Sequence, residues 1–445
     1  MSKKTGIAAI LLAAALLFSG CMMQTVDQMY RIPKRSAEFN ELQKAIDSSM
    51  GQREYSAPIS GENPQSVQMA DLDGDGDEEY LLYAKGTGEK PLQILIFSRM
   101  EEGYVLREIL DSHGSAFELV EYVEMDGNPG LELVVGRQVS DQVMRSLTVY
   151  SFADGMSKQL MSANYSKFVT SDLNENGLTE LMVIAPDSVE GNNAVATLYS
   201  CANGQIDRSR EVSLSGAADH IKRIMVSSLH GGYPAVYVAS SVEESAVITD
   251  VFAMRDGVFT NVSLSNESGT SVQTLRNYYV YADDIDEDGV LELPNLINMI
   301  PYTPNTIGNQ QYLIRWYAME LSGAEVDKLY TFHDLAAGWY LVLDDDWASR
   351  VTVSQNGSKY SFYLWRTSVT DWDSMLADRL ITIEVLTGAD REEKASMDGW
   401  FPLCRTESAV YAAKLEIAAQ ELALTQEDLV NCFHLIFKDW KTGET

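Results

Sequence analysis

The chain has 445 residues, of which 65 are Asp or Glu and 33 are Lys or Arg, and its formal net charge is −32. A charge of this sign and size repels nucleic acid, so we expect no nucleic-acid partner. The composition, 45% hydrophobic and 22% charged, is typical of a folded globular chain, and the length is sufficient for two domains. The excess of carboxylates suits a protein that holds several divalent cations.

The N-terminus has the pattern of an export signal. Lys3 and Lys4 precede an apolar run over residues 7–18, and two small residues lead to Cys21. The run is too short for a permanent membrane-spanning helix, so we expect residues 1–20 to be removed. The ending resembles a bacterial lipobox, with Phe18 where leucine is usual. This resemblance implies a lipid on Cys21 that anchors the protein to the extracytoplasmic face of the cell membrane; an ordinary signal peptide with an incidental cysteine is the alternative.

The other cysteines are Cys201, Cys404 and Cys432, and their spacing matches no metal site. A disulfide between Cys404 and Cys432 and buried free thiols both remain open. In either case, disulfides are not the framework of the fold.

A nine-residue acidic loop recurs through the middle of the chain. The first loop (71–79), the third (172–180) and the fifth (284–292) fit the pattern D-x-[DN]-x-[DN]-G-x-x-E. The second loop (124–132) keeps the oxygen-bearing side chains but has Pro129 in place of the glycine, and the fourth (228–236) keeps only its turn character. The loops recur about every 50 residues, which indicates a repeat architecture.

Short apolar strands flank each loop. One strand enters the loop, a second leaves it and two more follow, which gives four antiparallel strands per repeat. Such units are typical of propeller blades, which bury their faces only against neighbouring blades. We therefore predict a mainly β fold with an about five-bladed β-propeller over residues 52–334. Residues 54–59 are expected to close the ring, and an open solenoid is the alternative.

The loops and their flanking strands resemble FG-GAP or VCBS repeats, the blades of integrin α-chain propellers and of many bacterial surface proteins. The resemblance covers residues 52–334. It implies calcium in the loops and a partner bound on one face of the disc, and it does not by itself imply catalysis.

The loop pattern explains how calcium would be held. Calcium takes roughly six to eight oxygen ligands, and side chains at positions 1, 3, 5 and 9 with the carbonyl of position 7 supply them, while glycine at position 6 allows a left-handed backbone. The predicted ligands are Asp71, Asp73, Asp75, Asp77 (carbonyl) and Glu79; Asp172, Asn174, Asn176, Leu178 (carbonyl) and Glu180; Asp284, Asp286, Asp288, Val290 (carbonyl) and Glu292; and, as a weaker set, Glu124, Asp126, Asn128 and Glu132.

The alternative for every loop is an acidic β-turn without an ion, because Asp, Asn and Gly are ordinary turn residues. For the fourth loop, where His230 has no acidic neighbour, this is the prediction. Where metal is bound, we expect its role to be structural, since each ion would fix the corner of a blade.

The repeat stops after residue 334. Apolar strand patterns continue, and Thr425 to Asp428 has the pattern of a capping box before a helix with Leu429, Cys432, Phe433 and Ile436 on one face. An antiparallel sheet with a covering helix follows, a small α+β domain over residues 335–445. It is loosely similar to a PsbP-type domain of secreted lipoproteins. Its tryptophans either form the core or line a ligand groove: Trp339, Trp347, Trp365 and Trp400.

These patterns divide the chain into a signal peptide (1–20), a tether with a short helix (21–51), the propeller (52–334) and the α+β domain (335–445). Catalytic motifs such as G-x-S-x-G and H-E-x-x-H are absent from the sequence. We therefore expect a monomeric, calcium-stabilised binding or scaffolding module for a protein, glycan or envelope ligand. A secreted carbohydrate-active or other hydrolytic enzyme that uses paired carboxylates is the alternative. A third hypothesis makes the propeller a passive spacer for the C-terminal domain.

Overall fold

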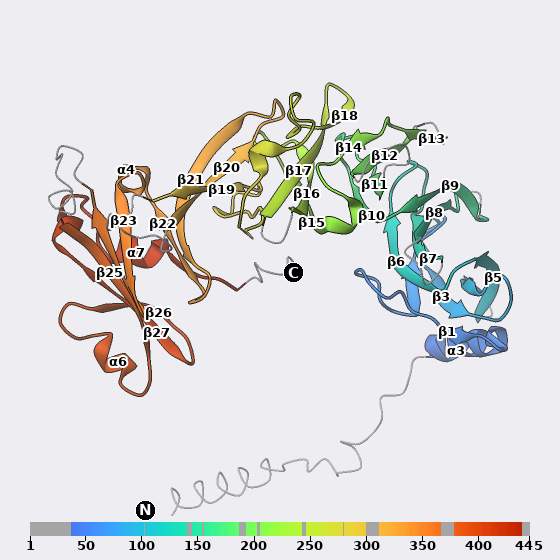
Figure 1. Ribbon diagram of the computed structural model, residues 1–445. Coiled ribbons are helices and arrows are strands. Elements are labelled where there is room, and N and C mark those ends of the chain that lie inside the picture. The colour runs from blue at the N-terminus through green and yellow to red at the C-terminus, as the bar shows by residue number, and fades with distance from the viewer. Residues whose placement is uncertain are drawn as a thin grey trace, which may run out of the picture. The chain divides into compact units, whose positions relative to one another are not determined.

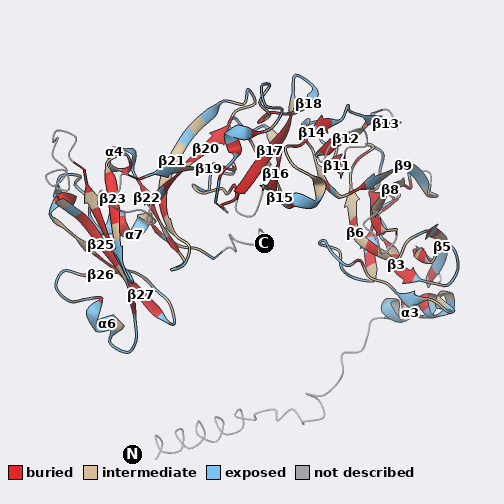
Figure 2. Ribbon diagram, in the orientation of Figure 1, coloured by how far each residue is buried: buried red, intermediate tan, exposed pale blue. Residues whose placement is uncertain are grey.

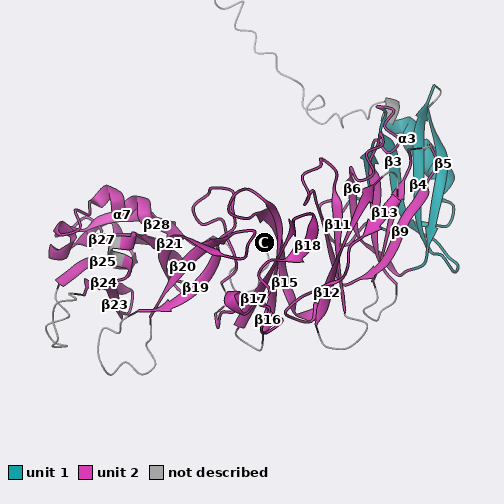
Figure 3. Cartoon of the chain, turned by 90° about the horizontal axis from the view of Figure 1, so that it is seen from above, with its two compact units in different colours: residues 1–57, 65–70, 77–113 teal, residues 58–64, 71–76, 114–445 magenta. Residues whose placement is uncertain are grey.

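The computed structural model describes residues 37–437, except residues 102, 140–144, 154, 187–192, 203–204, 243–245, 279, 300–310 and 366–377. The expected signal peptide, Cys21 and most of the tether lie outside the described residues. Among the residues that are described, no helix is long and apolar enough to cross a membrane. The chain forms two compact units, of which the first comprises residues 1–57, 65–70 and 77–113 and the second the remainder (Figure 3).

The first unit is a helix on an antiparallel sheet. Its elements are α3 (Ala37–Met50), β1 (Glu54–Tyr55), β2 (Val67–Ala70), β3 (Glu79–Lys85), β4 (Leu92–Met100) and β5 (Gly103–Ser112). Leu42 and Ile46 lie one helical turn apart and pack on the sheet beside Leu95 and Phe97. Both β1 and β2 pair with the same edge of β3. Residues 54–55 therefore belong to the first sheet, and they do not pair with a later one as the closing strand was expected to do.

The second unit continues with four sheets in chain order (Figure 1). The second sheet comprises β6 (Ala116–Val123), β7 (Glu132–Gln138), β8 (Arg145–Ser151) and β9 (Lys158–Tyr165), and the third comprises β10 (Lys167–Ser171), β11 (Glu180–Pro186), β12 (Ala194–Ala202), β13 (Gln205–Arg208) and β14 (Val212–Ser213). The fourth sheet comprises β15 (Ile221–Ser228), β16 (Pro234–Val242), β17 (Ala246–Arg255) and β18 (Val258–Asn261). The fifth sheet comprises β19 (Leu293–Asn298), β20 (Tyr312–Met319), β21 (Glu325–Asp334), β22 (Trp339–Leu343) and β28 (Phe433–Leu435). All pairings between these named strands are antiparallel, which confirms the predicted mainly β class.

The inner strands of these sheets are buried on both faces, as Figure 2 shows in red. In β11, Leu181 and Val183 pack with side chains of the preceding sheet, and Met182 and Ile184 pack with side chains of the following one. Successive side chains of a strand point to opposite faces, so a strand packed on both sides reads as a continuous apolar run. Each sheet of the second unit thus shares a core with its neighbour in the chain.

The fifth sheet extends beyond the last loop repeat. Strand β22 pairs with β21, and β28 returns from the C-terminal region to pair with β22. The boundary expected near residue 334 therefore falls between two paired strands. A sixth sheet follows in the order β23 (Val351–Asn356), β24 (Lys359–Leu364), β25 (Asp378–Thr387), β27 (Ala409–Leu415) and β26 (Phe401–Arg405).

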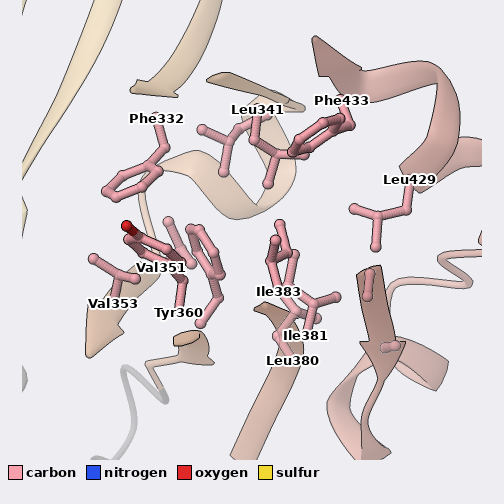
Figure 4. Close-up of a cluster of buried hydrophobic side chains, with 14 of the residues drawn as sticks. Phe332, Leu341, Val351, Val353, Tyr360, Leu380, Ile381, Ile383, Leu429 and Phe433 are labelled. Carbon is pink, nitrogen blue, oxygen red and sulfur yellow. The ribbon is translucent and has the colours of Figure 1, made fainter. Parts of the chain in front are cut away.

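The fifth and sixth sheets share a hydrophobic core. Phe332 and Leu341 of the fifth sheet lie in one cluster with Tyr360 and Ile383 of the sixth (Figure 4). Trp339 and Trp365 are buried in the core, whereas Trp400 lines a small pocket of about 210 Å³. The side chain of Trp347 lies outside the described residues.

The expected C-terminal helix is present but shorter than predicted. In α7 (Gln426–Cys432), the Thr425 hydroxyl accepts the Asp428 amide at 3.1 Å and Asp428 Oδ2 accepts the Thr425 amide at 2.9 Å, which confirms the capping box. The helix ends at Cys432, and Phe433 begins β28 because the edge of β22 offers it backbone partners. Cys201, Cys404 and Cys432 are free thiols.

Candidate metal sites

The first, third and fifth loops have a common backbone frame. The glycine at position 6 has a left-handed conformation in the first, third and fifth loops, with φ of 91° at Gly76, 85° at Gly177 and 87° at Gly289. Position 4 is left-handed as well, and Glu175 and Glu287 adopt it there although they are not glycines. These two reversals turn the side chains of the loop inward.

The aspartate at position 1 stabilises each of these loops by accepting hydrogen bonds from the backbone of the loop. Its two carboxylate oxygens each accept a backbone amide. In the fifth loop, Asp284 Oδ1 accepts the Asp288 amide at 2.9 Å and Oδ2 accepts the Gly289 amide at 3.0 Å. Asp71 and Asp172 accept amides of their own loops in the same way. Position 1 therefore stabilises the turn whether or not an ion is present.

The glutamate at position 9 is the buried member of each acidic loop, with Glu79, Glu132, Glu180 and Glu292 exposed by 3%, 2%, 1% and 0%. One oxygen of this glutamate accepts the amide of position 2 in three loops: Met125 to Glu132 at 2.8 Å, Leu173 to Glu180 at 2.8 Å and Ile285 to Glu292 at 3.1 Å. Burial raises the pKa of Glu132 and of Glu292 to about 7, and it raises the pKa of Glu180 as well. Position 9 thus closes the loop in addition to its predicted role as a ligand.

Carboxylates converge in two loops. Asp71, Asp73 and Glu79 of the first loop, and Asp284, Asp286 and Glu292 of the fifth, each place one oxygen within 4.8 Å of the other two. These two acidic clusters could bind a metal ion. Asp75, Asp77 and Asp288 are exposed members of the same loops.

The third loop compensates its buried carboxylate without an ion. The Asn174 side-chain amide donates to Glu180 Oε1, and Asn176 Oδ1 accepts the Leu178 amide at 2.7 Å. Both asparagines that the sequence offered as neutral ligands are therefore engaged in hydrogen bonds inside the loop. The backbone of Leu178 lies in the same turn.

The second and fourth loops also form hydrogen-bonded turns. Asp126 accepts the Asn128 amide at 2.8 Å and the Ser151 hydroxyl at 3.0 Å, and although burial opposes the effect, these hydrogen bonds lower the pKa of Asp126. In the fourth loop, the Gly232 amide donates to the Leu229 carbonyl at 2.9 Å and His230 is exposed. The fourth loop is built as a turn, as predicted.

The first three loops are joined by backbone hydrogen bonds at equivalent positions. The Leu131 amide of the second loop donates to the Asp71 carbonyl at 3.0 Å, and the Thr179 amide of the third donates to the Glu124 carbonyl at 2.6 Å. In both cases position 8 of the later loop bonds to position 1 of the earlier one. A Cβ on Gly130 would lie 2.2 Å from the Leu72 carbonyl oxygen, so only glycine permits this close approach.

Two basic residues beside the loops were not anticipated. Lys328 Nζ contacts Asp288 and lies 3.4 Å from Asp286 Oδ2 and 3.8 Å from Glu292 Oε1. Arg107 Nη1 lies 3.5 Å from Glu79 Oε1. Both are the extra residue of a β-bulge in the third strand after the loop, β21 and β5 respectively. The only signal in the sequence is a basic residue in that strand of an acidic repeat.

A groove of about 830 Å³ lies at the ends of the strands away from the loops. Along β10, Ser171 at the loop end pairs with Glu180, and Lys167 at the groove end pairs with Ile184. The groove is lined by Arg145, Ser166, Lys167, Pro186, Asn193, Ala217, Ala218, Asp219, His220 and Ile221. Arg145 is held in place by a 2.8 Å ion pair with Glu118 and a 2.8 Å hydrogen bond to the Ser166 carbonyl.

No protein-family model matches the sequence, and no curated protein matches it either. Among solved structures, the exotype rhamnogalacturonan lyase YesX is similar with a TM-score of 0.32 and 12% identity, over 71% of this chain and 64% of that chain. The rhamnogalacturonan lyase PL11 of Bacillus licheniformis gives 0.31 and 11%, over 71% and 70%. A protein from Lactobacillus plantarum gives 0.26 and 11%, over 70% and 83%. The resemblances to FG-GAP or VCBS repeats and to PsbP therefore rest on the residues alone.

Proposed function

We propose that the protein is a surface-anchored binding module whose loop repeats are stabilised by calcium. The observation that carries the proposal is the convergence of three carboxylate oxygens within 4.8 Å in the first and fifth loops. Carboxylates this close repel one another unless a cation compensates them, and calcium prefers a shell of such oxygens. A backbone hydrogen bond joins the first loop to the second, so an ion bound in the first loop also stabilises that junction.

We further propose that the ligand occupies the groove on the opposite strand ends. Arg145, Lys167 and His220 line it in a chain whose net charge is −32. Ser166 and Asn193 add polar groups that can bond to hydroxyls. This combination suits an extended, hydroxyl-rich ligand that carries carboxylates, such as an acidic glycan of an envelope.

The remaining parts of the proposal come from the sequence. A lipid on Cys21 would hold the module at the extracytoplasmic face of the membrane, with the segment up to α3 as its tether. The sheets would be the blades of an FG-GAP-type or VCBS-type propeller, followed by the PsbP-like region, in a monomer.

Thermal unfolding with and without calcium tests the metal part of the proposal. When the calcium concentration exceeds the dissociation constant about a hundredfold, binding at one site adds roughly 2.7 kcal/mol to the stability of the protein. We expect the melting temperature to rise by several degrees over that in a chelator, and the rise to shrink in Asp73→Asn and Asp286→Asn variants. Identical melting curves in calcium and chelator would contradict the proposal.

Binding to defined polymers tests the ligand part. We expect the intact protein to bind polygalacturonate or purified peptidoglycan more strongly than neutral dextran, and Lys167→Glu to weaken this binding. Lys158→Glu is the matched control, because Lys158 is exposed and pairs with Ser151, at the other end of the strands from Arg145. Release of reducing ends from these polymers by the intact protein would instead favour the enzyme alternative.

A further inference from the structure

Three acidic side chains of the fifth loop, Asp286, Asp288 and Glu292, divide their oxygens in the same way. One oxygen of each accepts a backbone amide of the loop: Asp288 to Asp286 Oδ1 at 3.3 Å, Val290 to Asp288 Oδ1 at 2.9 Å and Ile285 to Glu292 Oε2 at 3.1 Å. The oxygens left over are Asp286 Oδ2, Asp288 Oδ2 and Glu292 Oε1. Glu292 is fully buried, and its Oε1 accepts no hydrogen bond from the described part of the chain. This side chain therefore presents an uncompensated oxygen to the interior of the loop.

All three remaining oxygens face one ammonium group. Lys328 Nζ donates to Asp288 Oδ2 and lies 3.4 Å from Asp286 Oδ2 and 3.8 Å from Glu292 Oε1. An ammonium has three donors and no acceptor, so it matches three converging acceptors. The Lys328 side chain is only 17% exposed, and low exposure strengthens its attraction to the carboxylates.

A β-bulge in β21 places Lys328 beside the fifth loop. In β21, Asp327 pairs with Tyr317 and Leu329 with Trp316, so Lys328 is the additional residue between them. In the first sheet, Arg107 is likewise the additional residue of a bulge, and it lies beside Glu79. In the second sheet, the bulge residue is Leu160, which carries no charge. The second loop has Asn128 at position 5, and its Asp126 accepts the Ser151 hydroxyl. A basic bulge residue thus accompanies the two loops whose carboxylates converge.

We propose that Lys328 is the resident cation of the fifth loop. In the metal-free protein, its ammonium occupies the position that a divalent ion would take, and an ion enters only when the side chain withdraws, because two cations within that space repel each other. The fifth loop therefore stays folded without metal and binds divalent ions more weakly than its carboxylates alone would. The part of this proposal that concerns divalent ions rests on the proposed calcium binding, and the part that concerns the metal-free loop does not.

The test is Lys328→Met, which keeps the length of the side chain and removes its charge. In excess chelator, we expect its melting temperature to fall by about 2–4 °C. In calcium, we expect a larger rise than in the wild type, and calorimetric titration should give an affinity for calcium about tenfold higher at this loop. Arg315→Met is the matched control. Arg315 is 18% exposed and pairs with Glu325 and Asp327, outside the loop, so its loss should leave the calcium-dependent rise unchanged.

A triple variant, Lys328→Met with Asp286→Asn and Asp288→Asn, separates charge from packing. If the lysine acts through its charge, removing two carboxylates restores the melting temperature in chelator, even where Lys328→Met alone does not fold. A triple variant as unstable as Lys328→Met would overturn the proposal, and so would a Lys328→Met variant with wild-type behaviour in both conditions. If calcium changes the melting temperature of neither the wild type nor the variants, the proposed function fails. The melting temperatures in chelator still decide the role of Lys328.

Discussion

The third and fifth loops share one backbone frame and compensate their buried glutamate in different ways. Both tie one glutamate oxygen to the amide of position 2, Leu173 in one loop and Ile285 in the other. The second oxygen of Glu180 accepts the Asn174 amide of its own loop, whereas the second oxygen of Glu292 faces Lys328, which comes from another strand.

Between these two loops, the residue at position 3 decides whether the buried glutamate needs a cation. An asparagine at position 3 donates to the glutamate and makes the loop self-sufficient. The aspartate at position 3 of the fifth loop cannot donate and adds a second negative charge, so this loop depends on an ammonium or a metal ion. In the second loop, Asp126 at position 3 instead accepts the Ser151 hydroxyl. Three predictions test this comparison.

The largest effect is expected from removing the buried glutamate of either loop. Glu180→Ala leaves the Leu173 amide without its acceptor, and Glu292→Ala does the same to Ile285, so each should lose about 2–4 kcal/mol of unfolding free energy. Urea unfolding in chelator measures it. Glu175→Gln, an exposed change in the third loop, should stay within about 0.5 kcal/mol. A similarly small loss for either alanine variant would show that position 9 does not close the loop.

An intermediate effect is expected when the third loop is given the chemistry of the fifth. Asn174→Asp replaces the donor to Glu180 by a carboxylate, and we expect a loss of about 1–3 kcal/mol in chelator that calcium largely restores. Asn176→Asp is the control, because a carboxylate can still accept the Leu178 amide. If Asn174→Asp is as stable in chelator as the wild type, position 3 does not govern the need for a cation.

The smallest effect is a dependence on pH in the metal-free protein. Burial raises the pKa of Glu292 to about 7, above its ordinary value of about 4.3 in an unfolded chain. The contribution of this group to stability is therefore complete below about pH 4.3 and is lost as the pH rises through about 7, at a slope of about 1 kcal/mol per pH unit. Asp286, Asp288 and Lys328 face this carboxyl group.

Glu292→Gln removes the titration, so its unfolding free energy in chelator should fall less between pH 5 and pH 7 than that of the wild type. Glu175→Gln, at an exposed position, should follow the wild-type slope. Parallel slopes for Glu292→Gln and the wild type would show that Glu292 does not hold its proton in this range.

The sequence predicts what is local in this molecule. The bounds of the loops, the left-handed glycine at position 6 and the capping box at Thr425 all depend on residues within one turn of each other, so their patterns are visible in the chain. The two clusters of carboxylates follow from the same spacing.

What the sequence could not supply depends on strand register and on open edges. Lys328 reaches the fifth loop only because a bulge adds one residue to β21, and no pattern in the sequence marks that shift. Phe433 fits a helical face as well as a strand, and the free edge of β22 decides for the strand. The involvement of Asn174 with Glu180 likewise depends on a side-chain orientation that spacing does not determine.

The hydrogen bonds that run from Leu131 to Asp71 and from Thr179 to Glu124 have an evolutionary consequence. Because donor and acceptor stand at the same two places at both of these junctions, a copy of these repeats gained by duplication or lost by deletion meets its new neighbours with the same pair of groups. Repeats of this part of the chain can therefore be added or removed without a new kind of contact. An insertion of one residue within a loop, in contrast, misaligns the partners on both sides of it.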